Sequence, residues 1–217
     1  MSRTLLGVFD AVIFDFDGTL ADSHASMMRA YRIFADECGI DFEEAKRYTG
    51  MPTEAVARIL LPADIAPAAG LRIDELESSN TEGVVPLPGA VAALDAVPQA
   101  RLAIATSCTD RLIMARMAAA GLPLPDVTVT RDMVVNGKPA PDSFLLAADR
   151  LGVDPARCVV LEDAPAGVRG ARDAGCATIG IRTHHTDQEI GADWCVDTLA
   201  DLSFENTDEG VRISRIA

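Results

Sequence analysis

Two aspartates separated by a single residue, Asp15 and Asp17, are the residues of this chain best placed to do chemistry. They belong to the string FDFDGTL (residues 14–20), which follows an apolar run typical of a buried strand. Alternate residues of a strand share a face, so the two carboxylates are expected to start out on the same side, and Gly18 lets the backbone turn sharply after them. Two like charges this close are costly without a cation or a shared proton. The pattern predicts a site for a metal ion and a phosphate group, with a solvated Asp-Gly turn closing a hairpin as the alternative.

Other polar residues lie at comparable positions further along the chain. Thr106 and Ser107 follow one apolar run, Glu162 and Asp163 follow a later one, and Lys138 precedes a predicted helix. In an open α/β sheet, ligands bind outside the carboxyl ends of the strands, so these side chains are expected to meet. Together they supply acids for a hard cation, a hydroxyl group and backbone donors for phosphate oxygens, and one ammonium group.

The elements that must position these residues are predicted to alternate between strand and helix. Apolar runs predict strands over residues 8–14, 102–105, 127–129, 158–161 and 177–181. Capping and breaking residues predict three helices, bounded by Thr109-Asp110 and Gly121, by Pro141 and Gly152, and by Pro165 and Gly175. This alternation favours a parallel sheet with helices on both faces.

The segment from Ala21 to about Val85 is too long for a simple crossover and has helical periodicity without a convincing strand. Its apolar positions at helical spacing are expected to be core: Met27, Met28, Tyr31 and Phe34, then Val56, Ile59 and Leu60. Gly and Pro are concentrated in residues 83–89, which are expected to form the return linker. We therefore expect a discontinuous α/β core of residues 1–20 and 86–217, and a helical cap domain of residues 21–85.

Composition narrows the possible partners. The chain has 217 residues, 49% of them hydrophobic, which is enough for one substantial core and a small appended unit. Its net charge of −14 argues against nucleic acid or an anionic membrane as a partner, and an anionic substrate would need a locally positive pocket such as a bound cation. The sequence has no recognisable leader or membrane span, so a cytoplasmic location is expected. Its five widely spaced cysteines are expected to be reduced and mostly buried.

The chain resembles the haloacid dehalogenase superfamily of phosphotransferases over essentially its whole length. Four strings, in order, look like the four motifs of that superfamily: DFDGT (15–19), ATS (105–107), GKP (137–139) and LEDAPAG (161–167). Each string alone is a weak signal, but four in order at predicted strand ends make coincidence improbable. The resemblance implies a Rossmann-like α/β core and phosphoryl transfer with Mg²⁺.

The resemblance also implies a role for each polar residue in the transfer. Asp15 would be the nucleophile that takes the phosphoryl group. Asp17 would protonate the leaving oxygen and then deprotonate the attacking water. Thr106 would hydrogen-bond the phosphoryl oxygens, helped by backbone N–H groups near Ser107, and Lys138 would offset the negative charge.

The resemblance also implies which motif residues bind the metal and which lie at the phosphate. Asp15, Asp163 and the backbone carbonyl oxygen of Asp17 would bind Mg²⁺, with Glu162 as a further direct or water-bridged ligand. Gly18 and Thr19, in the first motif, are expected at the phosphate. An acidic helix N-terminus is the structural alternative for the Glu162-Asp163 pair.

Within the superfamily, Asp17 favours phosphate-ester chemistry, because dehalogenases and phosphonate-cleaving enzymes lack an acid there. The closest rival is a hexose-phosphate mutase of the β-phosphoglucomutase type. Such mutases carry a Lys just before the position of Gly50 and an Arg shortly after it, where this chain has Thr49 and Thr53, and Met27 stands where their early-cap His would align. Without those cations, the cap is expected not to hold the second phosphate of a bisphosphate intermediate.

Residues of the cap are weaker predictions. Thr53, Glu54 and Arg58 are candidates to contact substrate hydroxyl groups, although Glu54 is equally explained as a residue that stabilises a helix start. His24 could face the site but is expected to be structural or at the surface. His184 and His185 are expected to lie in a solvated loop.

The sequence thus predicts a Mg²⁺-dependent phosphatase that acts on a small sugar, polyol or related metabolite phosphate through a phosphoaspartate intermediate. A β-phosphoglucomutase-type enzyme is the alternative. A non-catalytic interaction protein on the same fold is disfavoured because Asp15, Lys138 and Asp163 are all present. The expected partner is a small phosphorylated metabolite, and the expected assembly is a monomer or a small homo-oligomer.

Overall fold

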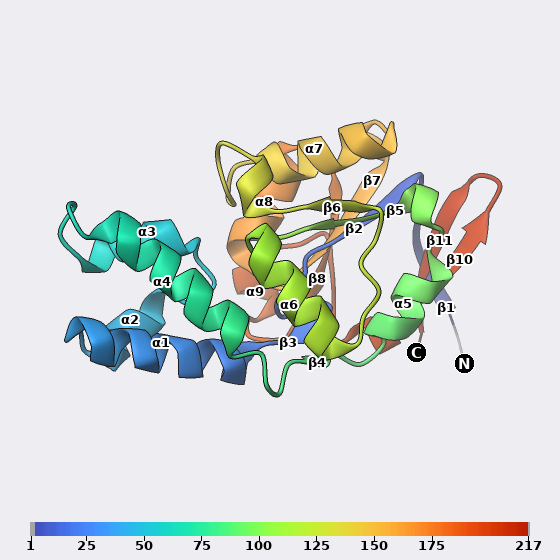
Figure 1. Cartoon of the computed structure of the whole chain (residues 1–217). Coiled ribbons are helices and arrows are strands. Elements are labelled where there is room, and N and C mark those ends of the chain that lie inside the picture. Colours follow the sequence, from blue (N-terminus) through green and yellow to red (C-terminus); the bar gives the residue numbers. More distant parts are fainter. Residues whose placement is uncertain (1–2, 217) are drawn as a thin grey trace.

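The computed structural model describes residues 3–216 and is built around a six-stranded parallel sheet. The order of its strands is β6 (Val127–Val129), β5 (Leu102–Ala105), β2 (Ala11–Phe14), β7 (Cys158–Glu162), β8 (Ala177–Ile181) and β9 (Trp194–Val196). The predicted strands over 102–105, 127–129, 158–161 and 177–181 are confirmed, and β9 at the sheet edge was not predicted. Figure 1 shows this sheet with helices above and below it.

Helices cover both faces of the sheet because its central strands are apolar on both sides. Residues of β2 alternate: Val12 and Phe14 pack in a cluster with α5 (Ala90–Ala96) and α6 (Asp110–Ala120), whereas Ala11 and Ile13 pack with residues of the helices on the opposite face. Those helices are α7 (Asp142–Leu151) and α8 (Pro165–Asp173). The side chains that follow the strands are therefore held at the edge of a sheet buried on both faces.

The predicted single strand over 8–14 is wrong, because the chain changes sheet at Asp10. Residues before it form β1 (Arg3–Phe9), which pairs antiparallel with β11 (Gly210–Ile216) in a second sheet completed by β10 (Leu202–Thr207). The Asp10 carboxylate forms an ion pair with Arg157, and the backbone N–H of Asp10 donates to the Arg157 carbonyl oxygen. This polar anchor separates two stretches that pair in opposite senses.

Four α-helices lie between residues 22 and 85 and group at the left of Figure 1, beyond the sheet. They are α1 (His24–Cys38), α2 (Phe42–Ala45), α3 (Thr53–Leu60) and α4 (Ala66–Ser79). They share an apolar cluster of their own that includes Met27, Tyr31, Phe34 and Val56, as predicted, whereas Ile59 is 49% exposed. The two connections to this helical segment pair with each other as β3 (Ala21–Asp22) and β4 (Val85–Pro86), a contact that was not predicted.

In the part of the chain that the structure describes, the remaining α-helix is α9 (Asp187–Ile190), which follows β8. Among the described residues, no helix has the length and apolar character needed to cross a bilayer.

Candidate active site

A buried ammonium group joins two carboxylates at the carboxyl ends of the central strands. Lys138 Nζ donates to Asp15 Oδ1 at 2.5 Å and to Glu162 Oε1 at 2.7 Å. Asp15 follows β2 directly and its N–H donates to the Leu161 carbonyl oxygen, while Glu162 is the last residue of β7. Neighbouring parallel strands end side by side, which brings together residues that are far apart in the sequence.

Asp163 adds a further carboxylate to this group. Ligand oxygens of Asp15, Glu162 and Asp163 all lie within 4.8 Å of one another. Burial raises the pKa of Asp15 to about 7 despite Lys138, and burial together with the carboxylates of Glu162 and Asp15 raises the pKa of Asp163 to about 9. Burial alone would lower the pKa of Lys138, but Asp15 and Glu162 raise it above its ordinary value. Three buried acids thus share one ammonium group, so the site is short of positive charge.

The donor set fits a hard divalent cation. Glu162 already accepts two hydrogen bonds, one at each oxygen, from Lys138 Nζ and from the Ala164 N–H at 2.7 Å. Within residues 3–216, no hydrogen-bond donor reaches the Asp163 carboxylate, and Asp15 accepts only at Oδ1. Asp15 and Asp163 therefore keep oxygens free for a metal, and Glu162 is better suited to a water-bridged position.

Two glycines are required by this packing. Gly18 has φ +84°, and a Cβ there would lie 2.2 Å from Asp163 Oδ2. A Cβ at Gly167, in the first turns of α8, would lie 1.7 Å from Glu162 Oε1. The backbone therefore approaches both carboxylates closely only because these residues lack a side chain.

A cavity of about 650 Å³ opens onto this cluster. It is lined by most of the residues predicted for phosphate and metal: Asp15, Asp17, Gly18, Thr106, Ser107, Lys138, Glu162 and Asp163. Thr106 is buried, and its hydroxyl accepts from the Cys108 N–H at 3.1 Å. Thr19 is fully buried and lines neither this cavity nor the one described below, and within residues 3–216 its hydroxyl has no hydrogen-bond partner.

The Asp17 carboxylate has a different set of partners from Asp15. Ser23 Oγ donates to Oδ1 at 2.5 Å, while Cys108 Sγ at 3.0 Å and Arg116 Nη1 at 2.8 Å donate to Oδ2. Asp15 and Asp17 were expected to share one face of the strand. Because the chain turns after β2, the two carboxylates instead have different hydrogen-bond partners. The metal contact predicted for the backbone carbonyl oxygen of Asp17 stays a prediction.

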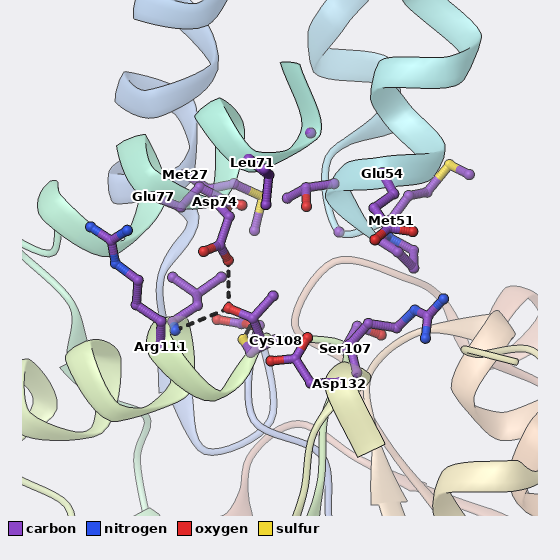
Figure 2. Close-up of a pocket in the computed structure, with 18 of the residues that line it drawn as sticks. Met27, Met51, Glu54, Leu71, Asp74, Glu77, Ser107, Cys108, Arg111 and Asp132 are labelled. Atoms are coloured by element: carbon purple, nitrogen blue, oxygen red, sulfur yellow. Dashed lines mark hydrogen bonds between the residues drawn. The ribbon is translucent and has the colours of Figure 1, made fainter. Parts of the chain in front are cut away.

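A second cavity, of about 410 Å³, lies between the helical segment and α6. Both cavities are lined by Asp17, Met27, Ser107 and residues 50–52. In Figure 2, Glu54, Asp74 and Glu77 lie on one side of the second cavity, and Ser107, Cys108 and Asp132 on the other. Asp17 therefore lies where the two cavities adjoin.

The predicted cap residues belong to this second cavity. Thr53, Glu54 and Arg58 all line it, and none of them lines the larger one. Glu54 and Arg58 approach each other at 3.4 Å with more than half of each side chain exposed, so their ion pair is weak. Whether they contact a substrate stays a prediction.

Arg116 was not singled out by the sequence, and the three histidines were expected to be structural or solvated. Arg116 lies on the buried face of α6, at helical spacing from Leu112 and Ala120, and this position was the signal that could have identified it. His24, His184 and His185 all line the larger cavity, with the rings of His24 and His184 5.2 Å apart between centroids. His184 is exposed, as expected of a loop, but the loop after β8 also borders the site. Only the fold brings these histidines together.

Comparison with known proteins agrees with this geometry. The sequence profile of haloacid dehalogenase-like hydrolases matches residues 9–175. The chain is 42% identical over 176 residues to hexitol phosphatase A of Escherichia coli, covering 78% of this chain and 81% of that protein. It is 33% identical over 182 residues to the fructose-1-phosphate phosphatase YqaB of the same organism, covering 80% and 97%.

Among solved structures, a putative β-phosphoglucomutase from Thermotoga maritima is similar with a TM-score of 0.66 and 32% identity, covering 88% of this chain and 95% of that one. The relatives thus include both of the activities that the sequence left open. The motifs, the parallel sheet and the match over residues 9–175 lead to one conclusion. The chain belongs to the haloacid dehalogenase-like hydrolase family.

Proposed function

We propose that this protein is a Mg²⁺-dependent phosphatase that hydrolyses the phosphate monoester of a small sugar, polyol or related metabolite. The observation that carries the proposal is the pairing of Asp15 with Lys138 at 2.5 Å in a cavity that Asp163 and Asp17 also line. This places a nucleophile, a countercharge, a metal ligand and a proton donor around one space.

In the first half of the reaction, an Asp15 carboxylate oxygen attacks phosphorus and the bond from phosphorus to the ester oxygen breaks. Asp17 donates a proton to that oxygen, so the alcohol leaves neutral and Asp15 carries the phosphoryl group. Lys138 offsets the charge that accumulates near Asp15, and Thr106 and the backbone beside Ser107 donate hydrogen bonds to the phosphoryl oxygens.

In the second half, Asp17 takes a proton from water, whose oxygen attacks phosphorus. The bond from phosphorus to Asp15 then breaks, inorganic phosphate is released, and Asp15 returns to its starting state. One carboxyl group therefore acts as the acid first and as the base second.

Mg²⁺ would be held by Asp15, Asp163 and the backbone carbonyl oxygen of Asp17, with Glu162 bonded to it through water. When bound, it would reduce the repulsion between the Asp15 carboxylate and the phosphate dianion and polarise a phosphoryl oxygen. The cation also supplies the local positive charge that an anionic substrate needs in a protein of net charge −14.

The second cavity is the space for the alcohol. Its carboxylates Glu54, Asp74 and Asp132 are acceptors for hydroxyl groups and would repel a further anionic group. This favours a neutral polyol or sugar, in line with the hexitol phosphatase and fructose-1-phosphate phosphatase relatives. Residues 21–85 would then act as a cap over the substrate, the partner would be a small metabolite rather than nucleic acid or a membrane, and the enzyme would work in the cytoplasm as a monomer or small homo-oligomer.

One observation favours the mutase as a second candidate. Besides Arg116, the second cavity is lined by Arg58, Arg111 and Arg131, cations that could bind a second phosphate. Of these, Arg58 lies close to Glu54, and Arg131 donates to the Val134 carbonyl oxygen at 2.8 Å. These contacts and the neighbouring carboxylates reduce what the arginines offer to a second phosphate.

The test is a phosphate-release screen over hexitol, hexose and glycerol phosphates with Mg²⁺, run beside an assay for conversion of β-glucose 1-phosphate to glucose 6-phosphate. We expect phosphate release from at least one polyol or sugar phosphate, and loss of that activity in excess chelator with recovery on adding Mg²⁺. Isomerisation without phosphate release would establish the mutase instead. Full activity in chelator would refute the metal assignment.

A further inference from the structure

The proposed reaction makes no use of Arg116, although this arginine of α6 is only 1% exposed. Removing a guanidinium group from water is costly, and an apolar residue of similar volume is often at least as stable in such a position. The Arg116 Nε also has no hydrogen-bond partner within residues 3–216. Stability alone therefore does not explain why this cation is buried, and we looked for a functional reason in its contacts.

Arg116 joins the Asp17 loop to the helical segment. Nη1 donates to Asp17 Oδ2 at 2.8 Å, and Nη2 donates to Glu77 Oε1, on α4, also at 2.8 Å. One planar guanidinium thus binds two carboxylates from different parts of the fold. A lysine cannot do this in the same geometry, because its donors are not arranged in a rigid fork.

The Glu77 end of this bridge is fixed by a second contact between the same helices. Asp74, one turn before Glu77 on α4, accepts from Thr109 Oγ1 at 2.5 Å, and Thr109 caps the N-terminus of α6. Residues three apart on a helix face the same side. Helix α4 is therefore bonded to α6 at two points, and Glu77 holds the guanidinium from a defined position.

We propose that Arg116, anchored by Glu77, is a positioning residue that keeps the Asp17 carboxylate where the two cavities adjoin. That is the place where the bond between the phosphoryl group and the leaving alcohol would break, since one cavity holds the Asp15 cluster and the other has room for the alcohol. The inference rests on the proposed function, because it assumes that Asp17 is the proton donor.

The dependence on the leaving group tests this role. An alkyl phosphate needs a proton on its departing oxygen, whereas p-nitrophenolate leaves without one. In single-turnover experiments, we expect Arg116→Met to slow release of the alcohol from a hexitol phosphate by roughly 10²-fold, and release of p-nitrophenolate from p-nitrophenyl phosphate by no more than about threefold. Arg116→Lys should restore part of the lost rate, and Glu77→Gln should show the same selectivity as Arg116→Met to a smaller degree.

Two further variants make the experiment decisive. Arg72→Met is the matched control, because Arg72 also binds two carboxylates, Glu37 and Glu75, but at an exposed site that lines neither cavity. It should leave both rates unchanged. Asp17→Asn is the benchmark and should show the strongest selectivity against the alkyl ester. Thermal unfolding of every variant confirms that the assay temperature lies below its transition.

The outcomes separate the two claims. Equal slowing of both substrates in Arg116→Met, with selectivity intact in Asp17→Asn, would show a merely structural arginine and overturn the inference alone. Absence of selectivity in Asp17→Asn would overturn the role of Asp17 and the inference with it. A wild-type protein that releases alcohol from neither ester would refute the proposed function itself.

Discussion

At the Asp15 carboxyl group, the same features that suit catalysis are costly to the fold. The side chain is 9% exposed and shares Lys138 with Glu162, so two carboxylates depend on one ammonium group. Breaking a buried pair by removing one partner leaves charge without compensation. Lys138 is therefore expected to affect stability and turnover together, unlike Lys46, the only other lysine of the chain, which lies at the surface.

Replacing Lys138 by methionine tests this double role. We expect kcat to fall by roughly 10²- to 10³-fold, as when one preorganised donor is removed. The free energy of unfolding of the metal-free protein should fall by about 3 kcal/mol, with part of it restored by adding Glu162→Gln. Lys46→Met, which breaks an exposed pair with Glu43, is the control and should change stability by less than about 0.5 kcal/mol. A Lys138 variant with normal kcat would contradict the proposed role of Lys138 in the reaction.

Replacing Asp15, unlike replacing Lys138, is expected to abolish turnover without lowering stability. Asp15→Asn removes the proposed nucleophile, so turnover should fall by more than about 10⁴-fold, and rapid quenching followed by mass spectrometry should find a phosphorylated protein only in the wild type. Because burial raises the pKa of Asp15, the variant should be at least as stable as the wild type without metal above pH 7. A phosphorylated Asp15→Asn protein would place the covalent intermediate elsewhere.

At the scale of elements, the turn between β2 and β3 determines how close the first motif comes to Asp163. Gly18→Ala should weaken Mg²⁺ binding and turnover, because the added Cβ would lie 2.2 Å from Asp163 Oδ2. Gly121→Ala is a matched control, since φ there is +65° and nothing lies within 4 Å. Both changes should cost about 1–2 kcal/mol of stability for the left-handed backbone. Titration with Mg²⁺ by calorimetry should separate them, and equal affinities would contradict the proposed metal position.

The same scale shows what the sequence could and could not predict. Strands β5 to β8 were predictable because each is a short apolar run bounded by turns, and the residues after them could be expected at one edge of the sheet. The break at Asp10 was missed, although Asp10 is the one charged residue within 8–14, because apolar residues continue on both sides of it and only pairing with β11 shows that the two halves belong to different sheets. The Arg116 bridge was equally hidden, since it depends on how α4 packs against α6. Local pattern fixes the elements, whereas the contacts between them depend on the fold as a whole.

For the whole molecule, charge is the property that connects substrate, metal and stability. The protein carries a net charge of −14, and its larger cavity is lined by the acids Asp15, Glu162 and Asp163. This cavity must nevertheless accept an anionic substrate. A divalent cation resolves both problems at once, by screening the acids from one another and by attracting the phosphate. Binding of Mg²⁺ should therefore depend on pH and should stabilise the fold.

The dependence of stability on pH gives the last prediction. The pKa of Asp163 is raised to about 9 in the folded protein, from about 3.9 in an unfolded chain. Between these values the folded state binds more protons than the unfolded state, so the free energy of unfolding of the metal-free protein should fall as pH rises from about 4 to about 9. Other groups and the net charge also contribute, but Asp163→Asn isolates this carboxyl group. In denaturant titrations without metal, the variant should gain stability relative to the wild type as pH rises. With saturating Mg²⁺ the difference should reverse, because only the wild type keeps both metal-binding carboxylates. A difference that does not change with pH or with Mg²⁺ would show that Asp163 remains ionised without a metal.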